Sequence, residues 1–172
     1  IHAYHRDLNF IPREDRDVRF RGNLSTSDEI AFQDCVIHEC CRQANDRNWP
    51  HQLHTGTHNM PDSDPTPLGA LARRYPKQNL VLLHNWPYAE MCGYLAKMNP
   101  NIYLDPCWQP ILSPDFFRRS MRLWRSYVPT TKIMISNDAT SIEMAVGASL
   151  FVREILGEIG RASCRERVCH RV

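Results

Sequence analysis

The sequence of 172 residues lacks several features that would assign it to a class of protein at once. No apolar run approaches the ~18 residues of a membrane-spanning helix, so no membrane partner is expected. CxxC pairs are missing, as are the G-x-G-x-x-G turn of dinucleotide-binding folds and the G-x-S-x-G turn of serine hydrolases. The chain has neither an initial Met nor a secretory signal, so we expect it to begin inside a longer protein or after processing.

Excess charge of one sign is also nearly absent. The formal net charge is +2, and residues 158–172 carry four Arg and two Glu, which leaves residues 1–157 neutral. A neutral body gives no reason to expect a nucleic-acid partner. The stretch EIGRASCRERV at the start of 158–172 resembles the translation of a common sequencing adapter. We therefore expect one domain over 1–157, followed by a non-native tail over 158–172.

The cysteines outside that tail form no pairing pattern and are odd in number. With no secretory signal in the sequence, reduced thiols in a cytoplasmic protein are expected. The five residues are Cys35, Cys40, Cys41, Cys92 and Cys107.

Short apolar segments alternate with amphipathic helical segments along the body. Strands are predicted to end near residues 56, 84, 105 and 138, and the helices that follow are predicted near 67–75, 87–99, 113–128 and 141–156. A further helix is expected from a capping box at Thr26 and Glu29, and Gly157 is expected to stop the final helix. Apolar strands that alternate with helices predict parallel βα units. Both a doubly wound sheet and part of a (β/α)8 barrel fit this pattern.

Polar side chains stand at the carboxyl ends of the predicted strands. They are His54, His84, Asp105 and Asp138. In parallel α/β folds these strand ends face the active site. Imidazole nitrogen and carboxylate oxygen are ligands that zinc accepts. One polar residue often ends a strand simply because a loop begins there, but the succession of four favours a metal site.

The segments that carry these residues resemble one known family. His54 in QLHTG, His84 in NLVLLHNWPY, the segment NPNIYLD and Asp138 in KIMISNDAT are similar to the last four strands of the amidohydrolase superfamily. The amidohydrolase-related (amidohydrolase 2) branch is most similar, and the resemblance covers about residues 1–157. It implies an α/β fold that is the C-terminal half, about strands four to eight, of a (β/α)8 TIM-type barrel.

The resemblance also implies a role for each strand-end residue. His54 matches a metal ligand, and Asp138 matches the residue that binds the metal or the attacking water and acts as base. His84 matches either a second-metal ligand or a general acid. A metal ion lowers the pKa of its water towards ~7, and a neighbouring carboxylate can accept the proton.

The chain departs from the family pattern in places that bear on substrate and metal count. No HxH pair of the kind found on the family's first strand occurs in the sequence. Arg6 lies where related sequences place a Tyr-Arg pair and is expected to bind a substrate carboxylate. Trp86, which follows His84 and Asn85, and Trp108, which could stack on a substrate ring, are expected to line the substrate site.

These observations predict a metal-dependent hydrolase of the amidohydrolase type that acts on a C–N or C–O bond of a small-molecule substrate, with zinc as the expected cofactor. A metal-dependent decarboxylase of the same fold is the alternative among enzymes, and a non-catalytic barrel with a binding role is the alternative outside them. A homo-oligomer is compatible with the sequence. The specific substrate is not readable from it.

Overall fold

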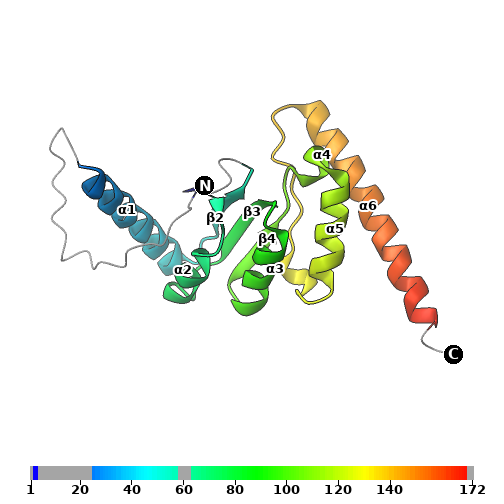
Figure 1. Cartoon of the computed structure of the whole chain (residues 1–172), viewed down its shortest axis with the longest axis horizontal. Helices are drawn as coiled ribbons and strands as arrows, with labels where there is room; N and C mark the ends of the chain where they lie inside the picture. The colour runs from blue at the N-terminus through cyan, green and yellow to red at the C-terminus, as the bar shows by residue number, and fades with distance from the viewer. Residues whose placement is uncertain (1, 4–24, 58–62, 170–172) are drawn as a thin grey trace.

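The computed structural model describes residues 2–3, 25–57 and 63–169 and has an α/β architecture with a parallel sheet (Figure 1). Arg6 and its neighbours, expected at the end of a strand, lie outside the described residues. The strands are β1 (His2–Ala3), β2 (His51–Gly56), β3 (Leu80–Trp86) and β4 (Ile102–Asp105). The helices are α1 (Thr26–Arg47), α2 (Leu68–Arg74), α3 (Ala89–Met98), α4 (Gln109–Leu112), α5 (Pro114–Arg125), the 3₁₀ helix η3 (Thr130–Lys132) and α6 (Ile142–Cys169).

The four strands lie in the order β1-β2-β3-β4, and each pairs in parallel with the next. A doubly wound sheet reverses its strand order at a switch point. No such reversal occurs among the described strands. Right-handed crossovers in an unreversed order place the connecting helices on one face of the sheet. This is the order found along the wall of a (β/α)8 barrel.

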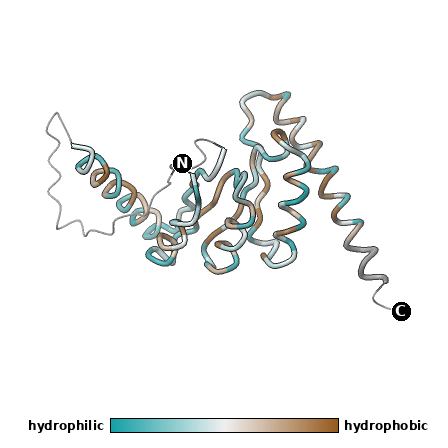
Figure 2. The backbone as a smooth tube through the Cα atoms, in the orientation of Figure 1, coloured by the Kyte–Doolittle hydropathy of each residue, from teal (hydrophilic) through white to brown (hydrophobic). Residues whose placement is uncertain are grey.

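Alternate residues of the strands face two different environments. One set packs against the helices as the main core, and the other forms a smaller cluster on the opposite face with Val81, Leu83 and Cys107. Each buried aliphatic side chain stabilises the fold by about 1.5–3 kcal/mol. Figure 2 shows the hydrophobic stretches within the sheet. The helix-facing residues of the strands are Leu53, Leu80, Leu82, Ile102 and Leu104, and their partners on the helices include Ile37, Cys41, Leu71, Cys92, Phe117, Trp124 and Ile155.

The beginnings of two helices follow from their capping residues. Ser113 accepts a hydrogen bond from the Phe116 amide, as the predicted start of α5 requires. The prediction for α1 was wrong by one residue, because its capping box joins Ser25 and Asp28 and not Thr26 and Glu29. Asp is as able as Glu to bond back to the N-cap amide here, so the spacing alone left two registers open.

The strand predicted over residues 132–136 does not form as a regular strand. Its pairing is limited to one parallel bridge between Leu104 and Ile133 and a bond from the Met134 amide to the Leu104 carbonyl, 2.8 Å long. Met134 and Ile135 are exposed, and no further strand pairs with them among the described residues. A segment that pairs on one side only, and briefly, forms an extended connection in place of a strand.

The final helix continues beyond its predicted end. Gly157 was expected to stop it, but α6 extends from Ile142 to Cys169. Packing explains the continuation: Ile159 is buried against the core, and the Glu158 carboxylate accepts a 2.9 Å hydrogen bond from Nε of Arg118 on α5. The packed part of the helix therefore includes the first two residues of the segment 158–172. No helix within the described ranges is long and apolar enough to cross a membrane.

Candidate metal site

The end of β2 approaches the end of β3 through a bulge. The pairing register between these strands shifts between Thr55 and Gly56. Gly56 has φ +67°, and a Cβ atom there would lie 1.8 Å from the Trp86 carbonyl oxygen. Only glycine fits such an approach. Thr55 secures the same junction by donating its hydroxyl proton to the Leu83 carbonyl at 2.8 Å. The sequence Thr55-Gly56 therefore determines how His54 sits beside β3.

His84 breaks the alternation of β3. Leu80 and Leu82 face the helices, whereas Val81 and Leu83 face the opposite side, so regular pleating would turn His84 towards the helices. His84 and Asn85 instead have φ values of 64° and 62°, in the left-handed region. This conformation is costly for a residue other than glycine and is found where the surroundings enforce it. It allows the His84 ring to lie 4.0 Å, centroid to centroid, from the ring of His54.

Side chains of neighbouring residues hold this backbone in place. The Gln109 amide nitrogen donates to the His84 carbonyl, 2.5 Å away. Asn85 donates through Nδ2 to the carbonyls of Leu82 and Asp105, each 3.0 Å away. Asn85 and Gln109 are almost completely buried, so these bonds form where water cannot compete.

Three potential metal-ligating side chains converge at this point. Nε2 of His54 lies 2.8 Å from Nε2 of His84, and that nitrogen lies 3.8 Å from Oδ2 of Asp138. All three ligand atoms lie within 4.8 Å of one another. His84 is fully buried, His54 is partly buried and Asp138 is exposed, so the cluster opens to solvent on the side of the carboxylate. Two imidazoles and a carboxylate form a donor set that zinc and similar divalent ions accept.

A hydrogen bond at Nδ1, the ring nitrogen that faces away from the cluster, orients the His84 ring. Nδ1 of His84 lies 3.2 Å from both the carbonyl oxygen and Sγ of Cys107. The carbonyl can only accept, which favours the tautomer with the proton on Nδ1. Nε2 then directs its lone pair towards His54 and Asp138, which is the usual arrangement of a ligating histidine. Burial raises the pKa of the adjacent Cys107 thiol to about 12, so this residue presents a neutral SH group to the ring.

The segment that carries Asp138 is held by residues at the end of β4. The Asp105 carboxylate accepts bonds from the Ser136 hydroxyl at 2.7 Å and the Ser136 amide at 3.2 Å. Burial raises the pKa of Asp105, and the bonds from Ser136 oppose this shift. Trp108 donates its indole N–H to the backbone carbonyl of Asp138 at 2.5 Å. Asp138 thus reaches the cluster through contacts with β4 and the turn that follows.

The structure brings together the three residues predicted to bind metal or act in catalysis. Of the three predicted substrate residues it describes two, Trp86 and Trp108, and places them differently. The Trp108 ring lies 5.1 Å from the His84 ring, next to the cluster. Trp86 packs edge-on against Phe116, with ring centroids 6.3 Å apart. The roles of all these residues, and that of Arg6, stay predictions. Sequence reasoning missed Gln109 and Ser136, for which no motif gave a signal.

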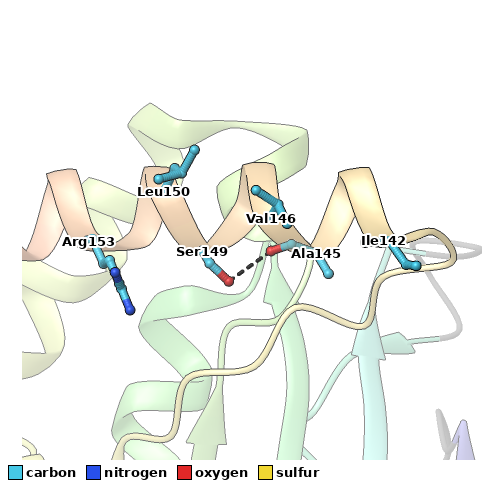
Figure 3. A pocket seen from close by; sticks show the side chains of 6 residues that line it. All are labelled: Ile142, Ala145, Val146, Ser149, Leu150 and Arg153. Atoms are coloured by element: carbon cyan, nitrogen blue, oxygen red, sulfur yellow. Dashed lines mark hydrogen bonds between the residues drawn. The ribbon is translucent and has the colours of Figure 1, made fainter.

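A hollow of about 370 Å³ lies along α6. Figure 3 shows its lining, in which the Ser149 hydroxyl donates to the Ala145 carbonyl at 2.8 Å. All six lining residues belong to this one helix, so the hollow has no facing wall within the described residues. They are Ile142, Ala145, Val146, Ser149, Leu150 and Arg153.

Part of the chain is similar to a curated protein. No family model matches the chain. Protein fluG of Emericella nidulans is 39% identical over 97 residues, which are 53% of this chain and 11% of that protein. The chain therefore spans only a small part of the curated relative that it matches.

Two solved structures resemble the fold. A protein proposed to be a metal-dependent hydrolase, from Lactobacillus casei ATCC 334, matches with a TM-score of 0.66 and 25% identity, over 72% of this chain and 35% of its own. Uronate isomerase from Thermotoga maritima matches with a TM-score of 0.72 and 15% identity, over 90% of this chain and 41% of its own. Both neighbours are of the TIM-barrel amidohydrolase type. The chain therefore shares its fold with less than half of each neighbour.

Proposed function

We propose that this chain is the C-terminal half of a (β/α)8 barrel of the amidohydrolase-related type, and that the barrel is a metal-dependent hydrolase. The convergence of His54, His84 and Asp138 at the carboxyl ends of successive strands carries the proposal. Active sites of such barrels lie at that end. The expected substrate is a small molecule with a C–N or C–O bond to be cleaved, and a cytoplasmic location stays a prediction.

Two features support the half-barrel. The strands follow one another in chain order without reversal, and the segment after η3 begins to pair with the outer edge of β4 through Ile133. The matches to the two solved barrels cover 35% and 41% of their lengths. Four parallel strands and a fifth extended segment are about what half of an eight-stranded barrel contributes.

The residues present fit a divalent metal ion, for which zinc is the expected choice. His54 and His84 would hold it through Nε2, because these two nitrogens face each other at 2.8 Å while Nδ1 of His84 faces the Cys107 carbonyl. Bound there, zinc would supply a water molecule acidic enough to attack at neutral pH. The Asp138 carboxylate, on the open side of the cluster, would accept a proton from that water. Burial of His84 at the closed side would exclude competing solvent.

Asp138→Asn tests this assignment because Asn keeps the size and one oxygen ligand but is not a base. In the full-length protein we expect the variant to retain much of its metal while turnover falls by about 10²–10⁴-fold. Metal content by elemental analysis is measured beside turnover. Full activity of Asp138→Asn with metal bound would contradict the mechanism.

His84→Asn separates the two roles left open for His84. If His84 is a metal ligand, this variant loses metal and turnover together. If it acts only as a general acid, it keeps the metal and loses turnover, as Asp138→Asn does. The 2.8 Å approach of its Nε2 to that of His54 favours the first result. Asn48→Ala is a suitable control, since Asn48 lies at the end of α1, outside the cluster.

A further inference from the structure

Asp138 has to be held in place without the support of a regular strand. Residues 134–139 carry no helix or strand, and Asp138 itself has a left-handed φ of 49°. Its side chain is 48% exposed, so packing around the carboxylate contributes little. The position of this proposed ligand therefore depends on the bonds made by its backbone and its neighbours.

The turn between β4 and α4 supplies those bonds. Trp108 lies in this turn with φ 65° and donates its indole N–H to the Asp138 carbonyl. The same ring lies 5.1 Å, centroid to centroid, from the His84 imidazole, and the two ring planes are tilted by 44°. One side chain therefore contacts both the backbone of Asp138 and the ring of His84. These two groups come from segments more than fifty positions apart in the chain.

We infer that Trp108 is a positioning residue, whose indole N–H holds the Asp138 backbone so that the carboxylate faces His54 and His84. This inference rests on the proposed function, because it assumes that the three residues share a metal ion. It differs from the predicted role of Trp108 as a platform for a substrate ring. A platform needs only the aromatic ring, whereas positioning needs the N–H group.

Trp124 offers a matched control for the lost hydrogen bond. Its indole N–H donates to the Ala89 carbonyl at 2.8 Å, and the residue is fully buried in the main core. Trp108→Phe and Trp124→Phe remove the same kind of bond, from an indole to a backbone carbonyl, and each keeps an aromatic ring. Both variants should lose stability, but only the first should affect metal binding.

Titration of the metal-free full-length protein with Co²⁺, followed by visible absorption, provides the test. We expect Trp108→Phe to raise the Kd for Co²⁺ by about 10–100-fold, as loss of a group that orients a ligand typically does. Trp124→Phe should leave this Kd at the wild-type value. Ser136→Ala, at an exposed residue whose hydroxyl bonds Asp105, should also weaken Co²⁺ binding and guards against a folding defect in Trp108→Phe.

The possible results are distinguishable. A wild-type Kd in Trp108→Phe overturns the positioning role, and it does so most clearly if KM for the substrate rises at the same time. An equal loss of Co²⁺ affinity in Trp124→Phe also overturns it, because the effect would then be one of general stability. Failure of the wild-type protein to bind Co²⁺ would contradict the proposed function itself.

Discussion

The two ends of the parallel sheet both bury polar side chains, but they use them differently. At the amino end, the Gln78 amide nitrogen donates to Nδ1 of His51 at 2.9 Å, and Asn101 donates to the carbonyls of Ala72, Tyr75 and Gln78 at 2.9–3.0 Å. At the carboxyl end, His54 and His84 direct Nε2 atoms towards each other and towards an exposed carboxylate.

The difference lies in where the lone pairs are directed. Nδ1 of His51 accepts a hydrogen bond from the Gln78 amide nitrogen, so its lone pair is used within the fold. At the other end, the backbone takes unfavourable left-handed conformations at His84 and Asp138, and the result is a set of ligand atoms that face one point. The buried polar network at the amino end bonds within the fold, whereas left-handed backbone at the carboxyl end is the kind of outlier from which a functional site is inferred.

Gly56→Ala should destabilise the protein most among these variants, because it disturbs the carboxyl end of the sheet. The added Cβ would collide with the Trp86 carbonyl, and φ +67° is unfavourable for alanine. We expect a loss of about 2–5 kcal/mol in the free energy of unfolding, together with weaker metal binding, because His54 and His84 would separate. Urea unfolding of the full-length protein measures it. Gly147→Ala, where a Cβ meets nothing within 4 Å, should be neutral or slightly stabilising.

Asn101→Ala should destabilise the amino end of the sheet and leave the metal site at the carboxyl end unchanged. Removing the side chain leaves the carbonyls at the end of α2 and in the turn that follows it, at Ala72 and Gln78, without this donor. We expect a loss of about 2 kcal/mol in unfolding free energy. Metal content should stay at the wild-type value. Loss of metal in this variant, measured on folded protein, would show that the two ends are coupled.

The buried thiols predict a smaller effect that depends on pH. Burial raises the pKa of Cys41, at the amino end, and of Cys107, at the carboxyl end, each to about 12. Above pH ~9 the unfolded chain loses these protons and the folded chain keeps them, so stability falls as pH rises. By pH 10 each thiol should lower the free energy of unfolding by about 1.4–2 kcal/mol. Urea unfolding at pH 8 and pH 10 checks this.

Single substitutions then assign the pH effect to each end. Cys41→Ala and Cys107→Ala should each remove their own part of the pH dependence, by similar amounts. An unchanged pH dependence in Cys107→Ala would mean that this thiol ionises within the folded protein, beside His84.

Most of the fold could be predicted where periodicity and capping agree. β4 and α5 have the predicted bounds within a few residues, and Phe117, Met121 and Trp124 are buried as their spacing indicates. The prediction of a strand after η3 was wrong, because a strand needs pairing partners on the sheet, and the local sequence does not reveal them. The predicted end of α6 at Gly157 was wrong, because the packing of Ile159 against the core outweighs the weak stop signal of the glycine.

The three residues that converge could be selected from the sequence, but their geometry could not, and their roles stay predictions. Strand-end positions and a family resemblance selected His54, His84 and Asp138, and the structure brings these three together. Regular pleating would have turned His84 the other way. The left-handed backbone that corrects this depends on Gln109, which reaches the His84 carbonyl from α4, and on the bonds that the adjacent Asn85 makes to Leu82 and Asp105. Such contacts across the chain have no signature in local spacing.

The most direct test of the account compares two histidines on the same strand. His54→Ala and His51→Gln are prepared in the full-length protein, and bound metal is measured by elemental analysis after exhaustive dialysis. Removing His54 takes a nitrogen ligand from the carboxyl end, so metal should fall to background and turnover should disappear. His51→Gln should keep the wild-type metal content, because His51 bonds Gln78 at the amino end. Wild-type metal content in His54→Ala, or equal loss of metal in both variants, would contradict the account.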